Sequence, residues 1–363
     1  MVNLVKYPPF VSPNRLESGK YPRTADYIPY GHSGQASPYV FLHGTENYVT
    51  TFNNIGRAFL DFRLSKDLNF KTSVGTIFGY SEANNWAGGI GDMGVQTTGS
   101  IADSRTLTTV NENVLNYTKT FNDAHDFGAM LGASYQRSQS RSVGMAAQPN
   151  TFGNDAIKTL NGAQINPATA SSSNSEWGLI SYFARVNYAY KGKYLVEGSI
   201  RRDGSSRFGP ENKWGNFPSA SVAWRISEED FLKGVSSISE LKFKASYGVT
   251  GNFNIGNFQY LGTVNNATYS PGNVITNGKV QSSLANSELS WEKTKGYNIG
   301  FELRMFQNRF GLTVDHYRNR TTDMLYSVNI PAITGFTNTI SNTGMVENRG
   351  FDVEFTSKNI VSR

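Results

Sequence analysis

Apolar and polar side chains alternate along this sequence, and a period of two is the feature that most restricts its fold. In the stretch GRAFLDFRLSKDLNFKTSVGTIF (residues 56–78), apolar side chains occupy the even positions from Ala58 to Leu64, and apolar side chains or threonines occupy those from Leu68 to Phe78. The charged side chains on either side of the break at 65–67 fall mostly on odd positions. Successive side chains of a strand point to opposite faces, so the pattern predicts a hairpin of two long strands.

The same alternation recurs to the end of the chain, and it assigns side chains to two faces. It is present in residues 125–136, 180–190, 194–201, 217–226, 241–250, 297–304, 310–315 and 351–356, and it is weaker in 105–120. We expect one face to carry Leu60, Phe70, Leu131, Val186, Val222, Phe243, Phe301 and Val353. We expect the opposite face to carry Arg63, Lys71, Arg185, Lys244 and Glu302.

The connections between these runs alternate in length. Short turns are expected near 65–67, 121–125, 191–193, 227–239 and 305–309, and long loops near 80–104, 141–177, 201–216, 251–287 and 318–340. Long strands with short turns at one end and long loops at the other are typical of outer-membrane barrels, whose short turns are periplasmic. The pattern therefore predicts an all-β protein, a transmembrane antiparallel barrel, here a partial barrel of about 11 strands in meander order. A soluble β-sandwich, whose strands also alternate, is the alternative.

Composition excludes several other classes of protein. The chain has no cysteine, so it can form neither disulfides nor thiolate metal sites. Its net charge of +6 comes from scattered residues and not from a basic block, so we expect no nucleic-acid partner. No apolar run is long enough for a transmembrane helix, whereas a transmembrane strand needs only about 9–11 residues. The beginning of the chain has no apolar core of the kind found in signal peptides.

The sequence has no set of residues that suggests catalysis. GIGDMG (89–94) matches a dinucleotide-binding pattern, but it follows no buried parallel strand and precedes no helical pattern. The four histidines have no ligand spacing. Glu228, Glu229 and Asp230 fit the solvated first turn of a short helix capped by Ser227. We therefore expect no enzymatic activity, no metal and no cofactor.

Four segments go beyond general barrel character. They are YFARVNYAYKGKYLVEGSIRRDGSSRFGPENKWGNFPSASVAWRISEEDFLK (182–233), LKFKASYGVTGNFNIGNFQY (241–260), LSWEKTKGYNIGFELRMFQNRFGLTVDHYRNRTTDMLY (289–326) and NTGMVENRGFDVEF (342–355). These segments strongly resemble the SusC/RagA-type TonB-linked outer-membrane proteins of Bacteroidetes. The resemblance is specific from about residue 177 onward and looser over 47–140. It implies a bacterial outer-membrane location and a barrel of about 22 strands closed by a plug.

The resemblance also implies a function and partners. It implies TonB-driven import of oligosaccharides or peptides, with a SusD-like surface lipoprotein, TonB acting through the plug, and outer-membrane lipid as partners. A TonB-dependent siderophore or cobalamin receptor and a passive porin are the alternatives. We expect residues 1–46 to be an irregular extracellular-loop segment and 47–363 to be an internal piece of the barrel, without signal peptide, plug or terminal strands. Such a piece is not expected to transport by itself.

Aromatic residues at the two ends of the predicted strands give two sets of candidate functional residues. Sugar rings stack on aromatic side chains, so the long loops offer these substrate-contact candidates: Tyr80, Trp86, Trp214, Phe253, Phe258, Tyr260 and Tyr269. Aromatic rings beside the short turns suit the headgroup level, which predicts a periplasmic girdle of Tyr188, Tyr190, Tyr194, Trp224 and Phe310. The charged residues of 201–216 are interpreted as part of a solvated loop.

Overall fold

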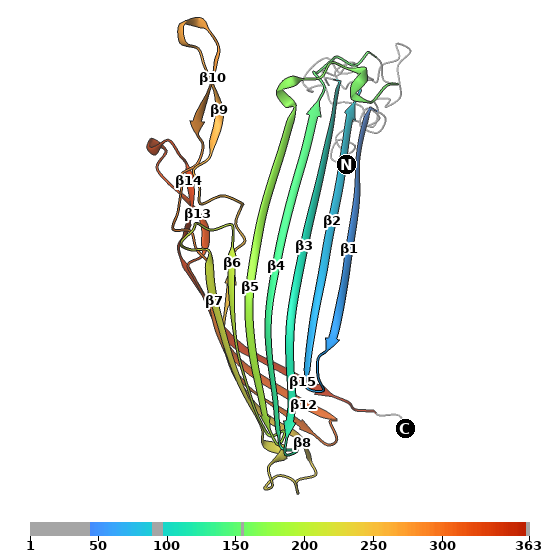
Figure 1. The fold of residues 1–363 in the computed structure, drawn as a ribbon, viewed down its shortest axis with the longest axis vertical. Coiled ribbons are helices and arrows are strands. Elements are labelled where there is room, and N and C mark those ends of the chain that lie inside the picture. Colours follow the sequence, from blue (N-terminus) through green and yellow to red (C-terminus); the bar gives the residue numbers. More distant parts are fainter. Residues whose placement is uncertain (1–43, 89–96, 154–155, 361–363) are drawn as a thin grey trace, which may run out of the picture. The chain divides into compact units, whose positions relative to one another are not determined.

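Eleven antiparallel strands form the main sheet of the computed structural model, which describes residues 44–88, 97–153 and 156–360. Neighbouring strands of the sheet follow in the order in which they occur along the chain (Figure 1). They are β1 (Thr45–Arg63), β2 (Leu68–Ala87), β3 (Thr98–Phe121), β4 (His125–Ala146), β5 (Ser171–Tyr190), β6 (Tyr194–Ser205), β7 (Trp214–Arg225), β8 (Ile238–Asn252), β11 (Glu292–Met305), β12 (Phe310–Thr322) and β15 (Met345–Ser357). The predicted meander of about eleven strands is confirmed.

Two additional hairpins lie in the long connections and were not predicted. They consist of β9 (Val264–Tyr269) with β10 (Thr276–Gln281), and β13 (Leu325–Asn329) with β14 (Asn338–Asn342). The helical segments within the described ranges are single 3-10 turns at Leu160–Gly162, Pro167–Thr169, Ile226–Glu228, Pro271–Asn273 and Ala332–Thr334. No helix in this part of the chain is long and apolar enough to cross a membrane.

The short turns have the backbone geometry that tight hairpins require. Asn122 and Asp123 between β3 and β4 have φ values of 50° and 53°, and Lys191 and Gly192 between β5 and β6 have φ values of 49° and 63°. Positive φ at two successive turn residues matches the right-handed twist of the flanking strands. The predicted short turns at 121–125 and 191–193 are therefore confirmed.

The strand register separates an apolar face from a polar face. Directly paired residues in an antiparallel sheet point to the same side. One row of paired residues that crosses five strands is apolar throughout: Trp224, Phe243, Phe301, Val314 and Val353. The next row along the strands points to the opposite side and consists of Ala223, Lys244, Gly300, Asp315 and Asp352.

These rows confirm the predicted division of the C-terminal strands between two faces. Val186 and Val222 belong to the apolar face because the register through β6 gives them the same parity as Trp224. Arg185 and Glu302 belong to the polar face with Lys244. Within β1 and β2, Phe62 stacks on Phe70 with ring centroids 6.3 Å apart, so the even positions of both strands share a face, as predicted. We call the apolar side the outward face and the polar side the lumen face.

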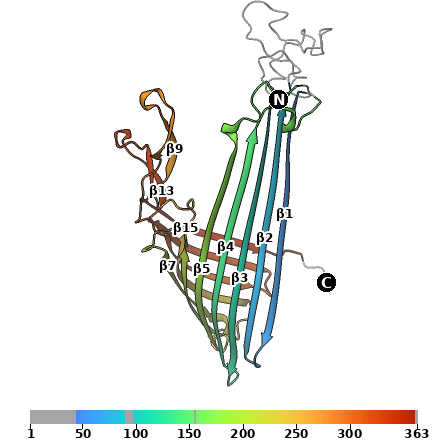
Figure 2. The same cartoon turned by 45° about the horizontal axis from the view of Figure 1, so that its top comes forward.

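The strands β2 to β5 are longer than the sequence predicted (Figure 2). Residues 80–104 and 141–177 were predicted to be loops, but β2 continues to Ala87, β3 begins at Thr98, β4 continues to Ala146 and β5 begins at Ser171. The prediction was wrong because it depended on hydrophobic alternation. Outward side chains need to be apolar only where they contact lipid. Backbone hydrogen bonding between strands can continue beyond that zone, where both faces of the sheet contact water.

The charged stretch 201–216 is also only partly a loop. β6 continues to Ser205 and β7 begins at Trp214, so Arg201 to Asp203 are paired strand residues. Arg201 Nε donates to Asp203 Oδ1 at 2.7 Å, and its Nη2 donates to Ser181 Oγ at 2.8 Å on β5. These charges therefore stabilise the lumen face of β5 and β6, and the interpretation as a solvated loop is corrected.

Contacts divide the chain into two units. One unit includes the residues up to Gly56, Thr76–Thr108 and Ser138–Glu176, and the other includes Arg57–Gly75, Thr109–Arg137 and the residues from Trp177 onward. The division at 46/47 stays a prediction, since residues 1–43 lie outside the described ranges. β1 and β15 are the two end strands of the sheet, as expected.

Candidate functional site

A hydrophobic cluster packs between β7 and the loops that follow β6, β8 and β10. Its buried members are Phe208, Phe217, Ile255, Leu289 and Trp291. Trp291 is 3% exposed, its ring centroid lies 5.2 to 5.4 Å from those of Phe208, Phe217 and Phe253, and its Nε1 donates to Lys213 O at 2.9 Å. Loops usually lie on the surface with few buried contacts, so this cluster gives the loops a core of their own. We call it the loop core.

Arg207 lies beside the loop core and was not identified from the sequence. Its guanidinium carbon lies 4.8 Å from the ring centroid of Trp177 and 5.4 Å from that of Phe253. Its Nε donates to Asn257 Oδ1 at 3.0 Å. Burial lowers the pKa of Arg207 below its usual value. The only sequence signal was an arginine in the glycine- and serine-rich stretch DGSSRFG, which does not reveal its distant aromatic partners.

The structure places the predicted substrate-contact residues in different environments. Phe253 and Tyr260 pack against the loop core, so they support the loops. Phe258 and Tyr269 remain 46% and 49% exposed. Tyr80 donates its hydroxyl hydrogen toward Glu82 and Asp103 on the outward face of β2 and β3. The seven aromatic residues therefore do not form a single site.

Trp214 lies on the outward face, and its contact with substrate stays a prediction. It pairs with Gly204, and its ring stacks on that of Tyr182 with centroids 6.2 Å apart. The Arg202 guanidinium lies 5.1 Å from the Trp214 ring centroid. Tyr182 shares the face of Val186, so Trp214 lies on the same side as the apolar residues. An aromatic ring on this face also suits a headgroup layer.

Trp86 is buried at the extracellular end of β2. It lines a cavity of about 570 Å³ with Glu46, Tyr48 and Lys158 among its other lining residues. The Lys158 ammonium lies 4.9 Å from the Trp86 ring centroid and forms an ion pair with Glu46. The Trp86 Nε1 donor has no partner among the described residues. Trp86 is thus a buried wall residue, and a stacking role for it stays a prediction.

The lumen face carries charges of both signs in close contact. Lys244 Nζ lies 3.2 Å from Glu302 Oε1 and 3.1 Å from Asp315 Oδ1, and Lys242 Nζ lies 3.8 Å from Glu302 Oε2. Arg304 and Glu240 form a further pair at 3.5 Å. Because these charges compensate one another, they provide a hydrophilic wall with little local net charge.

Four of the five predicted girdle residues form a continuous series of ring contacts through His125. The His125 ring contacts those of Tyr188 and Tyr190, with centroids 6.0 and 4.9 Å apart. Tyr194 lies between Tyr190 and Trp224, with centroid distances of 6.4 and 6.3 Å. Phe310 instead contacts Phe306 and Phe355. Their location at a membrane surface stays a prediction.

Glu229 connects this aromatic series to the turn after β7. Its carboxylate accepts hydrogen bonds from Tyr194 Oη at 2.6 Å, Lys193 Nζ at 3.0 Å and Trp224 Nε1 at 3.1 Å. The expected helix cap by Ser227 is wrong, because the 3-10 turn has Arg225 at its N-cap without a side-chain cap, and Glu229 is bonded to side chains. The hydrogen bonds from Tyr194, Lys193 and Trp224 lower the pKa of Glu229 from 4.5 to about 2.

Glu229 therefore makes a pH-dependent contribution to stability. A carboxyl group with a lowered pKa in the folded state stabilises the fold above its unfolded pKa, and this contribution is lost as the pH falls through the folded pKa. We expect the thermal midpoint of the protein to fall between pH 4.5 and pH 2, and this fall to be smaller in Glu229→Gln. Glu211→Gln, which removes an exposed carboxylate, is the control. Equal pH dependence in wild type and Glu229→Gln would contradict the assignment.

No set of side chains in the described ranges is arranged for metal binding, since they contain no cluster of three or more histidine, cysteine, aspartate or glutamate residues suited to a metal ion. His125 Nδ1 lies 2.6 Å from Tyr188 Oη, and His316 Nδ1 lies 3.0 Å from Gly350 O. The GIGDMG segment, His32 and His43 lie outside the described residues.

Comparison with known proteins identifies similar sequences and folds. The family description "TonB dependent receptor-like, beta-barrel" matches residues 6–358. The chain is 44% identical over 253 residues to TonB-dependent receptor P39 of Formosa agariphila, covering 69% of this chain and 24% of P39. It is 32% identical over 314 residues to TonB-dependent receptor SusC of Bacteroides thetaiotaomicron, covering 84% of this chain and 30% of SusC.

A solved structure shows the same fold. The RagAB peptide transporter superposes with a TM-score of 0.83 at 24% sequence identity, over 91% of this chain and 36% of that chain. The chain thus spans 24% and 30% of the length of the two curated relatives and about a third of the solved one.

Proposed function

The chain belongs to the TonB-dependent receptor-like β-barrel family of the bacterial outer membrane, and from this premise we propose that it forms part of the wall of a SusC-like nutrient importer. The observation that carries the proposal is the 32% identity to SusC over 84% of the chain. An apolar outward face and a charge-compensated lumen face suit a wall between lipid and a hydrophilic pathway.

The proposed substrates are oligosaccharides, with peptides as the second class. The exposed rings of Phe258 and Tyr269 lie in the long connection after β8, where they are accessible to a ligand at the extracellular mouth. Aromatic faces stack on the apolar faces of sugar rings and also accept peptide side chains. In the whole protein, a SusD-like lipoprotein would deliver substrate to these loops, and TonB would act through a plug domain.

Uptake by cells tests the proposed function. We expect deletion of the gene to abolish uptake of at least one member of a panel of fluorescent oligosaccharides, and the full-length gene to restore it. Phe258→Ala combined with Tyr269→Ala should reduce this uptake, whereas Trp214→Ala, which removes an outward ring, should not. Loss of ferric-siderophore uptake with unchanged oligosaccharide and peptide uptake would support the siderophore alternative and reject the proposal.

A further inference from the structure

Two arginines face each other across β3 and β4 without an acidic partner. The side chains of Thr106 and Ser140 are joined by a 2.9 Å hydrogen bond, as are those of Thr108 and Ser138, so the register places Arg105 opposite Arg141. Both arginines are exposed. Neither side chain forms a hydrogen bond or an ion pair with another described residue. Like charges directly opposite each other in a sheet repel, so this pair is unfavourable unless an anion binds to it.

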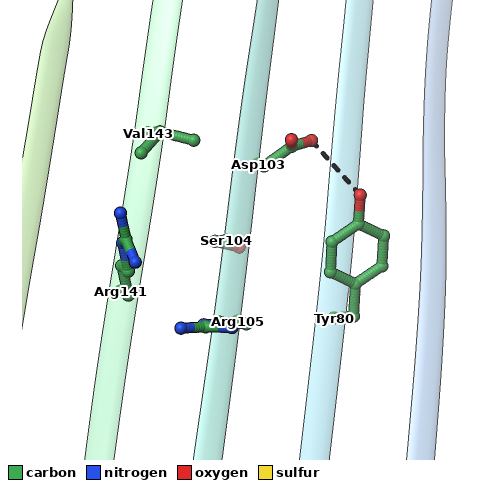
Figure 3. Close-up of a pocket in the computed structure, with 6 residues that line it drawn as sticks. All are labelled: Tyr80, Asp103, Ser104, Arg105, Arg141 and Val143. Atoms are coloured by element: carbon green, nitrogen blue, oxygen red, sulfur yellow. Dashed lines mark hydrogen bonds between the residues drawn. The ribbon is translucent and has the colours of Figure 1, made fainter.

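The arginine pair lies between two hollows of the sheet surface and lines both. One, of about 210 Å³, is also lined by Tyr80, Asp103 and Val143, and its Asp103 side chain points toward the Tyr80 hydroxyl on β2 (Figure 3). The other, of about 380 Å³, has a mixed lining that includes Phe78, Leu107, Gln139 and Asn174. Guanidinium groups, amides and apolar side chains thus meet in one place.

The pair lies on the outward face, where apolar side chains give way to charged ones. Tyr117 contacts Phe127 with ring centroids 6.1 Å apart, so odd positions of β3 and β4 share a face. This is the outward face, because His125 on β4 contacts Tyr188, which has the parity of Val186 on β5. On β3, Arg105 is the next outward residue after Leu107. On β4, the outward positions from Phe127 to Tyr135 carry no charge, and the charged ones follow. This sequence of side chains matches the passage from acyl chains to headgroups.

We propose that Arg105 and Arg141 bind a phosphate group of an outer-leaflet lipid. Guanidinium groups bind phosphate through paired N–H donors with high geometric specificity. A lipid is the occupant because the same hollow includes Phe78 and Leu107, which can contact an acyl chain while the arginines hold the phosphate. An imported substrate is not suited to the site, since it would pass along the opposite face. The proposal depends on the outer-membrane location and not on the proposed substrate.

Lipid binding by the full-length protein tests this proposal. Delipidated protein in a non-ionic detergent is titrated with bisphosphorylated lipid A, and bound lipid is counted by native mass spectrometry. We expect each of Arg105→Gln and Arg141→Gln to weaken binding about tenfold, because a hydrogen bond to a charged group is lost. The matched control is Arg185→Gln, which removes the same charge from the lumen face and should leave affinity unchanged. Heat-modifiable migration verifies that every variant is folded.

Two further probes distinguish the source of the phosphate. Dephosphorylated lipid A should bind the wild type as weakly as lipid A binds the double variant, which combines Arg105→Gln with Arg141→Gln. Millimolar inorganic phosphate should displace lipid A only weakly, because it lacks the acyl contacts. Equal affinity of wild type and double variant, or an equal loss in Arg185→Gln, would overturn the site. Tight binding of inorganic phosphate would show that the site does not require a lipid. Arginine-dependent binding of an acidic protein, without binding of lipid A, would show that the ligand is not a lipid.

Discussion

Replacement of Val222 by arginine is expected to destabilise the folded barrel by about 1–2 kcal/mol, because a charge on the lipid face costs about 2–4 kcal/mol at the bilayer midplane and about 0–1 kcal/mol near the interface. Val222 lies two residues from Trp224 of the predicted girdle, between these two depths. Val222 pairs with Val196 on β6 and Ala245 on β8, so the outward surface around it is apolar. The new guanidinium would have no acidic partner within this row and would have to reach toward a headgroup. The free energy of unfolding is measured by guanidinium chloride titration of full-length protein in phospholipid vesicles.

Ser221→Arg is the matched control, since it introduces the same side chain one position away on the lumen face. Ser221 pairs with Glu197 on β6 and Ser246 on β8, so the new cation would enter a polar row that contains a carboxylate. We expect its effect on the free energy of unfolding to be well below that of Val222→Arg. Equal destabilisation by the two variants would contradict the assignment of one face to lipid and the other to a polar interior.

Replacement of Trp291 by alanine is expected to cost about 3–5 kcal/mol, the usual loss when a large aromatic side chain is removed from a packed core. Trp291 contacts Phe208, Phe217 and Phe253, so its removal leaves a cavity. It also removes one of the two hydrogen bonds that Lys213 O accepts, the other coming from Ser205 N. The lost packing energy stabilises the loop core, so we expect the loops to loosen while the strands stay folded. Hydrogen exchange and limited proteolysis of residues 206–213 and 253–290 should increase strongly.

Trp214→Ala removes the same side chain from an environment that is 42% exposed, and it is the control for the loop core. We expect it to leave the proteolysis of both loops close to that of wild type. If Trp291→Ala left hydrogen exchange in these loops unchanged, Trp291 would not hold them together. A uniform increase in exchange over all strands would instead indicate a global loss of stability.

The sequence was sufficient to predict the orientation of strand side chains where one face of the sheet meets lipid and the other meets polar surroundings. The parity of Val186, Val222 and Phe243 is fixed by lipid on one side and polar surroundings on the other, so it could be read residue by residue. The turn at Lys191 and Gly192 was predictable for a related reason, since alternation stops there and resumes immediately. Local chemistry was enough in both cases.

The sequence was not sufficient where a residue's role depends on partners far away in the chain. Glu229 was interpreted as a solvated carboxylate, because nothing near it indicates hydrogen bonds from Tyr194 and Trp224. Arg105 and Arg141 are 36 positions apart, and only the register of β3 and β4 brings them opposite each other. The ends of β2 to β5 were missed because both faces become polar there while pairing continues.

A cysteine scan across β7 and β8 tests the central claim, that this sheet separates lipid from a polar interior. These 363 residues contain no cysteine, so within them a spin label at each of Ser221, Val222, Phe243 and Lys244 reports one position only. In lipid vesicles, we predict that labels at Val222 and Phe243 are relaxed by oxygen, which partitions into lipid, and that labels at Ser221 and Lys244 are relaxed by a water-soluble nickel chelate. Accessibilities without this alternation, or with the two pairs reversed, would contradict the account.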